Sequence, residues 1–264
     1  MSAMDWNDVF RLPAAALAGG RRIPKTVLTS RAMLTKHEQR TLDKMRRLEH
    51  LATVAKGTAQ VLPRVDEEFD IQSVIFLRCE MAGDSEAVSE VARLLHGCFP
   101  NPTVICQEAA GKVAISASLT RKSHAERGAT VVTDAESTGI FDPEDERCAP
   151  FLDSLAFARL PQDDLLSYLR ALAGCVRLSR AIGPLGFYPS CSPEDRERLL
   201  EFVADYDASQ REVDALAERR RGKDVSPNDS ARLRIQIRKA ERQRDNALGQ
   251  IRGLCAMPDE EIER

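Results

Sequence analysis

The sequence lacks the cysteine arrangements that build disulfide frameworks and zinc sites. Its seven cysteines stand singly, with no C-x-x-C pair and no adjacent histidine. Histidine is also scarce, and none of the four histidines has a partner at metal-ligand spacing. We therefore expect reduced cysteines packed in a core, no bound metal and no histidine-based catalytic triad.

Long apolar runs and nucleotide-binding motifs are absent as well. No unbroken apolar run is long enough to span a membrane, and the N-terminus shows no charged-then-apolar leader. The phosphate-binding patterns G-x-x-x-x-G-K-[ST] and G-x-G-x-x-G do not occur. We expect a cytoplasmic protein with no membrane contact, no small-molecule cofactor and no ATPase activity of its own.

The composition that is present suits a globular fold. A hydrophobic share of 43% supports a normal core, and 264 residues suffice for one large domain and an appendage. With 38 basic and 41 acidic residues the net charge is −3, so any affinity for nucleic acid has to be local.

The first part of the chain alternates between helical and strand patterns, which predicts an α/β (α+β) fold with a mixed sheet and packed helices. In "LTKHEQRTLDKM", Thr35 and Glu38 form a capping box that starts a helix predicted to reach Arg47. The branched run "FDIQSVIFLRCE" is typical of a central strand, and two apolar runs around Gly111 predict a hairpin. Further strands are predicted at 48–55 and 129–133, helices at 85–98 and 161–183, a surface loop at 134–150 and extended chain at 151–161.

The last part of the chain differs in kind. Prolines and glycines in "GPLGFYPSCSPEDRE" mark a boundary, which gives domains at 1–186 and 187–264. Beyond it, apolar or small residues recur every three or four positions in two stretches, one from Leu199 and one from Leu233. A glycine and a second Ser-Pro pair separate the stretches. The second domain is therefore predicted to be an antiparallel, coiled-coil-like helical hairpin on the order of 40 Å long.

One arrangement has the residue types of a metal-dependent nuclease site. Asp70 and Gln72 stand at the start of the long predicted strand, close to further acids, and Lys112 stands on a neighbouring strand. Phosphodiester cleavage by metal ions needs carboxylates beside a lysine. The alternative is a set of solvated residues at a strand edge, because no Glu-x-Lys pair follows on the next strand.

The hairpin carries the clearest charge pattern. Between Arg219 and Arg244, ten basic residues stand against three acidic ones. Such a patch suits a phosphate backbone or an acidic protein surface, and the alternative is a solvated face whose charges pair with the acidic first helix. Few aromatic residues lie nearby, so base stacking is not expected. The basic residues assigned to binding are Arg219, Arg220, Arg221, Lys223, Arg232, Arg234, Arg238, Lys239 and Arg242.

Two smaller basic groups precede the hairpin. The stretch "GGRRIPK" contains Arg21, Arg22 and Lys25, which either contact an anion or anchor the N-terminal segment on the sheet. The stretch "TRKSHAER" places Arg121 and Lys122 directly after a strand, where a rigid scaffold displays loop residues. The two groups together could form one positive rim, although the sequence does not show that they meet.

Six short motifs occur in a recognisable order: "FRLP", "GRRIPK", "FDIQSVIFLRCE", "GCFPNPTVICQ", "AISASLTRKSHAER" and "LAFARLPQDDLLSYLRAL". Their order resembles a bacterial family known as domain of unknown function 4391, over about Phe10 to Leu254. The resemblance implies a compact α/β part followed by a charged helical tail. It also implies an accessory subunit encoded beside helicase and DNA-methyltransferase genes in restriction and phage-defence islands. It supplies no catalytic residues.

The leading hypothesis is therefore a non-enzymatic subunit of a bacterial antiviral or restriction complex. Its partners would be a helicase-like ATPase, a methyltransferase or DNA, contacted through the basic hairpin. A metal-dependent nuclease subunit is the first alternative. A structural oligomerisation module is the second, because Arg244 at an inward seam position disfavours a tight two-helix core and favours a partner's carboxylate.

Overall fold

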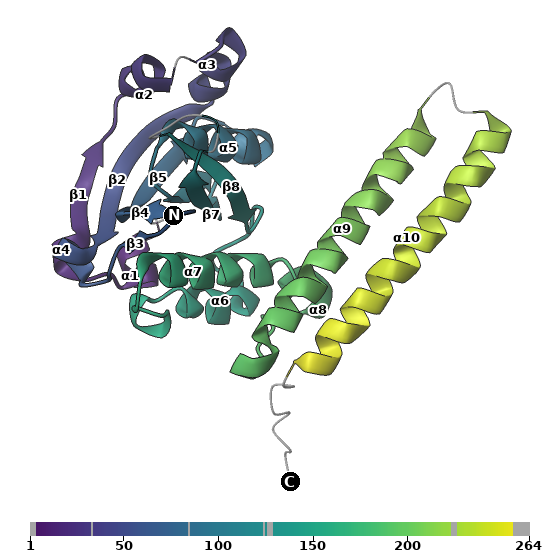
Figure 1. Ribbon diagram of the computed structural model, residues 1–264. Coiled ribbons are helices and arrows are strands. Elements are labelled where there is room, and N and C mark those ends of the chain that lie inside the picture. Colours follow the sequence, from purple (N-terminus) through teal and green to yellow (C-terminus); the bar gives the residue numbers. More distant parts are fainter. Residues whose placement is uncertain are drawn as a thin grey trace. The chain divides into compact units, whose positions relative to one another are not determined.

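The computed structural model describes residues 4–32, 34–83, 85–123, 125, 129–222 and 226–255. Lys223, one of the basic residues assigned to binding, lies outside them. The chain divides into two compact units, Met1–Val176 and Arg177–Arg264. The first contains a mixed sheet with helices, and the second contains two long helices (Figure 1). The predicted mixed α/β class with a C-terminal helix pair is confirmed.

A mixed sheet organises the first unit. Among the described residues its strands lie in the order β1-β2-β5-β6-β7-β8. β5 and β6 pair in parallel, and the other neighbouring strands pair antiparallel. The strands are β1 (Leu17–Arg22), β2 (Met45–Ala55), β5 (Ser73–Met81), β6 (Thr103–Ala109), β7 (Lys112–Lys122) and β8 (Thr130–Ser137). A separate small sheet consists of β3 (Arg64–Val65) and β4 (Asp70–Ile71).

Both faces of this sheet are covered, because alternate residues of its central strands are apolar on both sides. Leu77 and Cys79 of β5 join a core with residues of α2 (Lys25–Ala32), α3 (Lys36–Asp43) and α5 (Val88–Cys98). Phe76 points the other way, and its ring lies 5.0 Å from that of Phe10 in α1 (Trp6–Phe10). The remaining helices before the hairpin are α4 (Lys56–Ala59), α6 (Ala149–Ser154), α7 (Leu165–Ser179) and α8 (Ile182–Leu185); α7 crosses the division between the units, and α8 belongs to the second.

The hairpin prediction around Gly111 is confirmed. β6 and β7 pair antiparallel with Ala109 opposite Lys112, so Ala110 and Gly111 form the turn. Both turn residues have positive φ, 50° and 82°, which is the backbone geometry of a tight two-residue hairpin. The central strand is also confirmed, since β5 lies inside the sheet between β2 and β6.

The helix predicted to reach Arg47 ends earlier. Its capping box is present, since Thr35 accepts a hydrogen bond from the backbone of Glu38, whose side chain bonds back to Thr35. The helix ends at Asp43, and Met45 begins β2. Pairing of β2 along the whole of β5 stabilises the extended chain more than the local helical pattern does.

The extended chain predicted at 151–161 is wrong. Residues Ala149–Ser154 form α6, and a 3-10 turn follows at Phe157–Arg159. Phe151 and Leu155 are fully buried, four residues apart, which is helical spacing within a segment too short to reveal its period. The long strand predicted at 69–80 is also interrupted, because β4 pairs with β3 and only β5 joins the main sheet.

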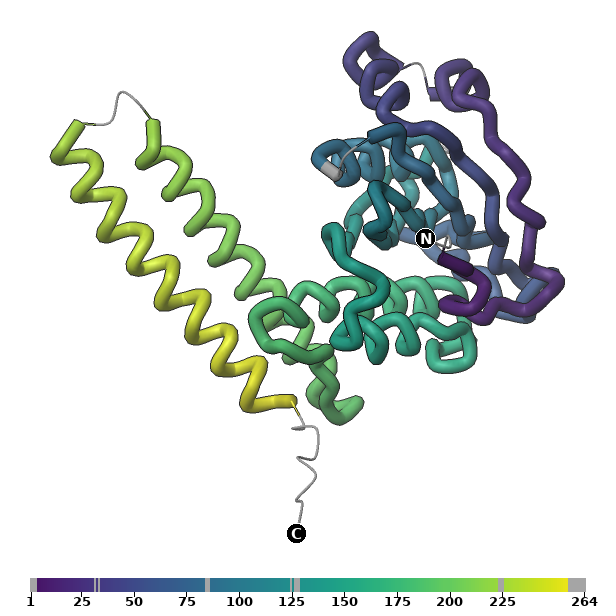
Figure 2. The backbone as a smooth tube through the Cα atoms, turned by 180° about the vertical axis from the view of Figure 1, so that it is seen from behind, coloured from purple at the N-terminus to yellow at the C-terminus, as the bar shows by residue number. Residues whose placement is uncertain are grey.

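The second unit is built around an antiparallel pair of helices, α9 (Arg196–Arg221) and α10 (Pro227–Leu254). Both Ser-Pro entries are confirmed: Ser192 and Ser226 each accept a hydrogen bond from the backbone three residues later. α9 has 26 residues and is therefore about 39 Å long. Figure 2 shows the two helices side by side along this length. The buried seam consists of Leu199, Val203, Val213, Leu233, Ile237, Ala240, Ala247 and Ile251.

Candidate functional site

The outer face of α10 gathers the basic residues of the hairpin. Leu233, Ile237 and Ile251 of this helix are buried in the seam, which fixes the direction of the opposite face. At about 100° per residue, Arg238 and Arg242 lie roughly 140° and 180° around the helix from Leu233. Both are exposed. We call this surface the outer face of α10; its basic members between residues 232 and 242 are Arg232, Arg234, Arg238, Lys239 and Arg242. Asp245, at about 120°, lies on the same side of the helix and pairs with Arg244.

The acids of the first helix, α9, were the alternative partners for these cations. Among the described residues, no ion pair joins an acid of α9 to a cation of the outer face of α10. Asp207 of α9 instead pairs with Arg180 at 2.7 Å, and Asp214 accepts a hydrogen bond from Gln210. The pairing of these cations with acids of α9, one of the two alternatives that the sequence left open, is therefore not seen among the described residues.

The end of α9 adds three more cations. Arg219, Arg220 and Arg221 occupy its last turn, and all three are exposed. Positive charge at a helix C-terminus interacts favourably with the carbonyl end of the helix dipole, which helps to hold the arginines there. In the part of the hairpin that the structure describes, none of the three forms an ion pair. The outer face of α10 and this turn therefore make up the candidate binding surface.

Arg244 is satisfied within the chain. It occupies the predicted seam position, is partly buried and donates hydrogen bonds to Asp245 at 2.8 Å and to Gln210 at 3.3 Å. A partner's carboxylate is not needed to compensate it.

The basic residues of β1 lie on an edge strand. Gly19 and Gly20 have φ values of 65° and 68°, and the register between β1 and β2 shifts at this point, which marks a bulge. Arg21 and Arg22 follow the bulge and are exposed. Lys25 begins α2 and approaches Asp43 at 3.8 Å. The glycines thus form a bulge within β1, and the two arginines after it face solvent.

Arg121 and Lys122 lie elsewhere on the sheet. Arg22 is level with Ile115 of β7, following the register through β2, β5 and β6. Lys122 is seven residues further along β7, or about 23 Å at the rise of a strand. Lys122 donates to the carbonyl oxygen of Asp66, and Arg121 donates to that of Lys122. The two basic groups therefore do not form a common rim.

The three residues of the nuclease hypothesis, Asp70, Gln72 and Lys112, do not form one site. Asp70 accepts a hydrogen bond from Gln72 at 2.8 Å, so this pair does lie together. The neighbouring Glu68 bonds to the backbone of Lys122, whereas Lys112 starts the same strand ten residues earlier, about 33 Å away. Among the described residues no group of three or more potential metal ligands occurs. Asp70 and Lys112 therefore do not share a site.

A charged network on the sheet was missed by the sequence reasoning. Arg78 of β5 forms two hydrogen bonds of 2.8 Å with Glu108 of β6 and reaches Glu49 of β2 at 3.5 Å. Trp6 donates to the same carboxylate of Glu108 at 2.7 Å. The hydrogen bond with Glu108 is the main cause that raises the pKa of Arg78. The sequence signal that could have revealed this network is Arg78, a charged residue at an inward-facing position of the largely apolar strand β5.

An open cleft of about 630 Å³ adjoins this network at the ends of β5 and β6. Five charged residues line it together with smaller and apolar ones: Arg46, Glu80, Glu108, Lys112 and Glu144. Glu80 pairs with Arg46 at 3.0 Å, and the oxygens of Glu108 already accept bonds from Arg78 and Trp6. Because Glu80 and Glu108 already have partners, their oxygens are less available to a metal ion or a substrate than those of unpaired carboxylates.

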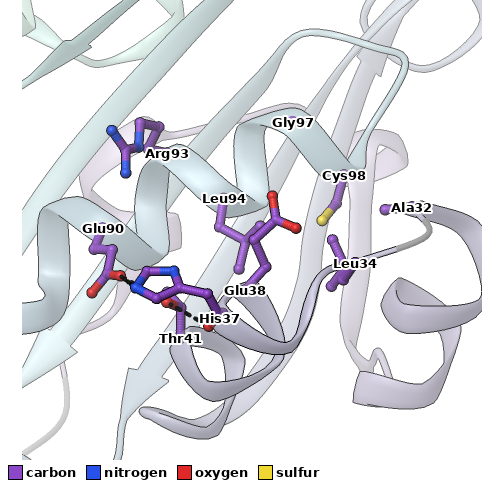
Figure 3. A pocket seen from close by; sticks show the side chains of 10 residues that line it. All are labelled: Ala32, Leu34, His37, Glu38, Thr41, Glu90, Arg93, Leu94, Gly97 and Cys98. Atoms are coloured by element: carbon purple, nitrogen blue, oxygen red, sulfur yellow. Dashed lines mark hydrogen bonds and ion pairs between the residues drawn. The ribbon is translucent and has the colours of Figure 1, made fainter.

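A smaller pocket of about 290 Å³ lies between α3 and α5. Figure 3 shows His37 directed toward Glu90, with Cys98 at the opposite end of the pocket. Hydrogen bonds from Lys44 and Thr41 lower the pKa of Glu90. Burial raises the pKa of Cys98 to about 11, so its thiol is protonated and a poor nucleophile at neutral pH. The pocket holds no activated catalytic group.

Comparison with known proteins places the chain by family. The model of a domain of unknown function, DUF4391, matches residues 10–243. The chain belongs to the DUF4391 family. The matched region of this DUF4391 protein runs through the sheet and along α10 as far as Gln243, so it includes the whole outer face of α10. No curated protein and no solved structure matches the chain.

In the part of the chain that the structure describes, no helix combines the length and the apolar character needed to cross a bilayer.

Proposed function

We propose that this protein is a non-enzymatic accessory subunit that holds nucleic acid by its phosphate backbone, with the hairpin as the contact arm. The single observation that carries the proposal is the outer face of α10, where five exposed cations have no ion-pair partner among the described residues. Lysine and arginine clusters of this kind release counterions from a nucleic-acid backbone, and that release drives binding.

The chemistry of the arm favours backbone contact over reading of single-stranded bases. Proteins that bind single strands stack bases on aromatic rings. The aromatic share of the whole chain is 5%, and the outer face of α10 contains no aromatic residue. Arginine, which binds phosphate with two parallel hydrogen bonds, accounts for four of its five cations.

The setting of this activity is a bacterial antiviral or restriction complex in the cytoplasm. The arm would bring nucleic acid to a helicase-like ATPase, with a methyltransferase as a further subunit. The first unit, with its covered sheet and exposed edges, would serve as the docking body. An acidic surface on a protein partner is the competing ligand for the same cations, because it offers the same charge.

The test is binding of the full-length protein to a fluorescent DNA duplex, measured by anisotropy. The variant carries Arg234→Glu, Arg238→Glu and Arg242→Glu, which reverse one side of the outer face. Arg252→Glu is the matched control, since Arg252 is also exposed on α10 but lies outside the cluster. We expect binding to fall at least a hundredfold in the triple variant and little in the control.

Equal affinity of the triple variant and the wild type for the duplex would overturn the proposal. Absence of binding to any nucleic acid, together with charge-dependent binding to an acidic protein subunit, would assign the arm to protein docking instead.

A further inference from the structure

An exposed isoleucine lies at the centre of the outer face of α10. Ile235 keeps 70% of its surface exposed, more than any other large hydrophobic residue of the described chain. It lies two residues, or about 200°, around the helix from the buried Leu233. The seam spacing does not require an apolar residue there.

Cations flank Ile235 on both sides. Arg234 and Arg238 lie about 100° and 140° around the helix from Leu233, on one flank. Lys239 and Arg232 lie about 240° and 260° around, on the other flank. Along the axis, the set from Arg232 to Arg242 spans about 15 Å. The face thus places Ile235 between two lines of positive charge, with Arg242 near the same angle as Ile235, about 180° around the helix from Leu233.

This arrangement matches the cross-section of a duplex groove better than a single strand. A groove has a phosphate backbone on each side and base edges on its floor. The major groove of B-form DNA is about 12 Å wide and accepts an α-helix, whose diameter with side chains is about 10–12 Å. An apolar side chain on the groove floor contacts the methyl group of thymine.

We propose that α10 lies in the major groove of double-stranded DNA, with Ile235 against the base edges and the two flanks on the two backbones. This inference rests on the proposed function and makes it more specific, since it selects duplex DNA from nucleic acids in general. Duplex RNA is disfavoured, because its A-form major groove is too deep and narrow for a helix to read. Single-stranded DNA is disfavoured because it presents only one backbone.

The experiment compares three probes of equal charge per strand: a DNA duplex of two helical turns, about 21 base pairs, the matching RNA duplex, and one DNA strand alone. Full-length wild type, Ile235→Ala and Leu62→Ala are titrated against each by anisotropy. Leu62 is the matched control, since it is also a large exposed hydrophobic residue, at 51%. Alanine favours helix, so Ile235→Ala is expected to fold.

The wild type is expected to prefer duplex DNA to both other probes by about tenfold or more. Ile235→Ala should bind duplex DNA about tenfold more weakly, because apolar contact is lost, while its salt dependence is unchanged. Leu62→Ala should behave as the wild type does.

Equal binding of all three probes, or equal binding by Ile235→Ala and the wild type, overturns groove entry. In that case the charge-reversal variant still loses affinity, and the proposed backbone contact stands. If no probe binds, the proposed function and this inference fail together.

Discussion

The side chain of Arg244 on α10 donates a hydrogen bond to the side-chain oxygen of Gln210 on α9, at 3.3 Å. The buried residues that α9 and α10 contribute to this seam are leucine, isoleucine, valine and alanine, so Arg244 brings a polar contact into an apolar interface. Polar residues at such positions fix the register of paired helices and cost some stability. The charge of Arg244 is bonded within the hairpin, whereas the cations of the outer face of α10 form no ion pair among the described residues.

Replacing Arg244 with leucine should stabilise the hairpin by about 1 kcal/mol, because an apolar residue fills the seam without the cost of desolvating a charge. The measurement is chemical denaturation of the full chain, followed by helical circular dichroism. Arg252→Leu, which is exposed, should leave the midpoint unchanged. A loss of stability in Arg244→Leu would show that the crossing to Gln210 contributes more than it costs.

Acid should destabilise the first unit through His96. This residue is 2% exposed and hydrogen-bonded to Thr103 and Ser116, and burial lowers its pKa from 6.5 to about 4. The unfolded chain therefore takes up a proton that the folded chain resists. The contribution of His96 to the free energy of unfolding is fully present above pH 6.5. It is lost as the pH drops toward 4, by about 3 kcal/mol in total.

The check is the difference in unfolding free energy between wild type and His96→Gln, measured across this pH range. Glutamine keeps hydrogen-bonding capacity but does not titrate, so the difference should shrink as the pH falls. His37→Gln serves as the control, because that side chain is 79% exposed. A constant difference between wild type and His96→Gln would contradict the prediction.

The hydroxyl of Tyr168 is buried without a hydrogen-bond partner in the described structure. Tyr168→Phe should therefore leave stability unchanged or raise it by up to about 1 kcal/mol. Thr103→Val removes a buried hydroxyl that does have partners, His96 among them, and should cost about 1–3 kcal/mol. Thermal unfolding of both variants compares them directly; a clear loss in Tyr168→Phe would mean that the hydroxyl is bonded in solution.

Removing Arg78 should weaken the first unit more than removing a surface arginine. Arg78→Met leaves Glu108 and Glu49 without their shared cation, at an expected cost of about 2 kcal/mol, reduced from fully buried values because Arg78 is 28% exposed. Arg46→Met removes a pair with Glu80 on the surface and should cost less than about 0.5 kcal/mol. Adding Glu108→Gln to Arg78→Met should recover part of the lost stability, because it removes the unpaired carboxylate. If no stability is recovered, the loss in Arg78→Met comes from packing and not from the unpaired charge.

The sequence revealed those elements whose signal is local. The capping box of Thr35 and the Ser-Pro entry at Ser226 were found because each depends on residues within one turn. The end of α3 and the start of β2 were missed, because pairing with β5 decides them. The helical turn at Phe151 was missed because six residues are too few to show a period.

The same distinction applies to the candidate sites. The cations of α10 are close in sequence, so their clustering on one helix could be predicted. The separation of Asp70 from Lys112 depends on strand register, which the sequence does not display. Arg78, Glu108 and Glu49 come from three strands and meet only in the folded sheet. Ile235 was not singled out from the sequence, because it stands outside the three- and four-residue spacing of the seam.

The most direct test of the account is the salt dependence of duplex DNA binding by the full-length protein. The slope of log K against log salt counts the phosphates that the arm neutralises, at about 0.9 per contact. We predict a steep slope for the wild type, and a reduction of about 1 for each of Arg238→Gln and Arg242→Gln but none for Arg252→Gln. A shallow slope that none of these substitutions changes would contradict the claim that the outer face of α10 binds a nucleic-acid backbone.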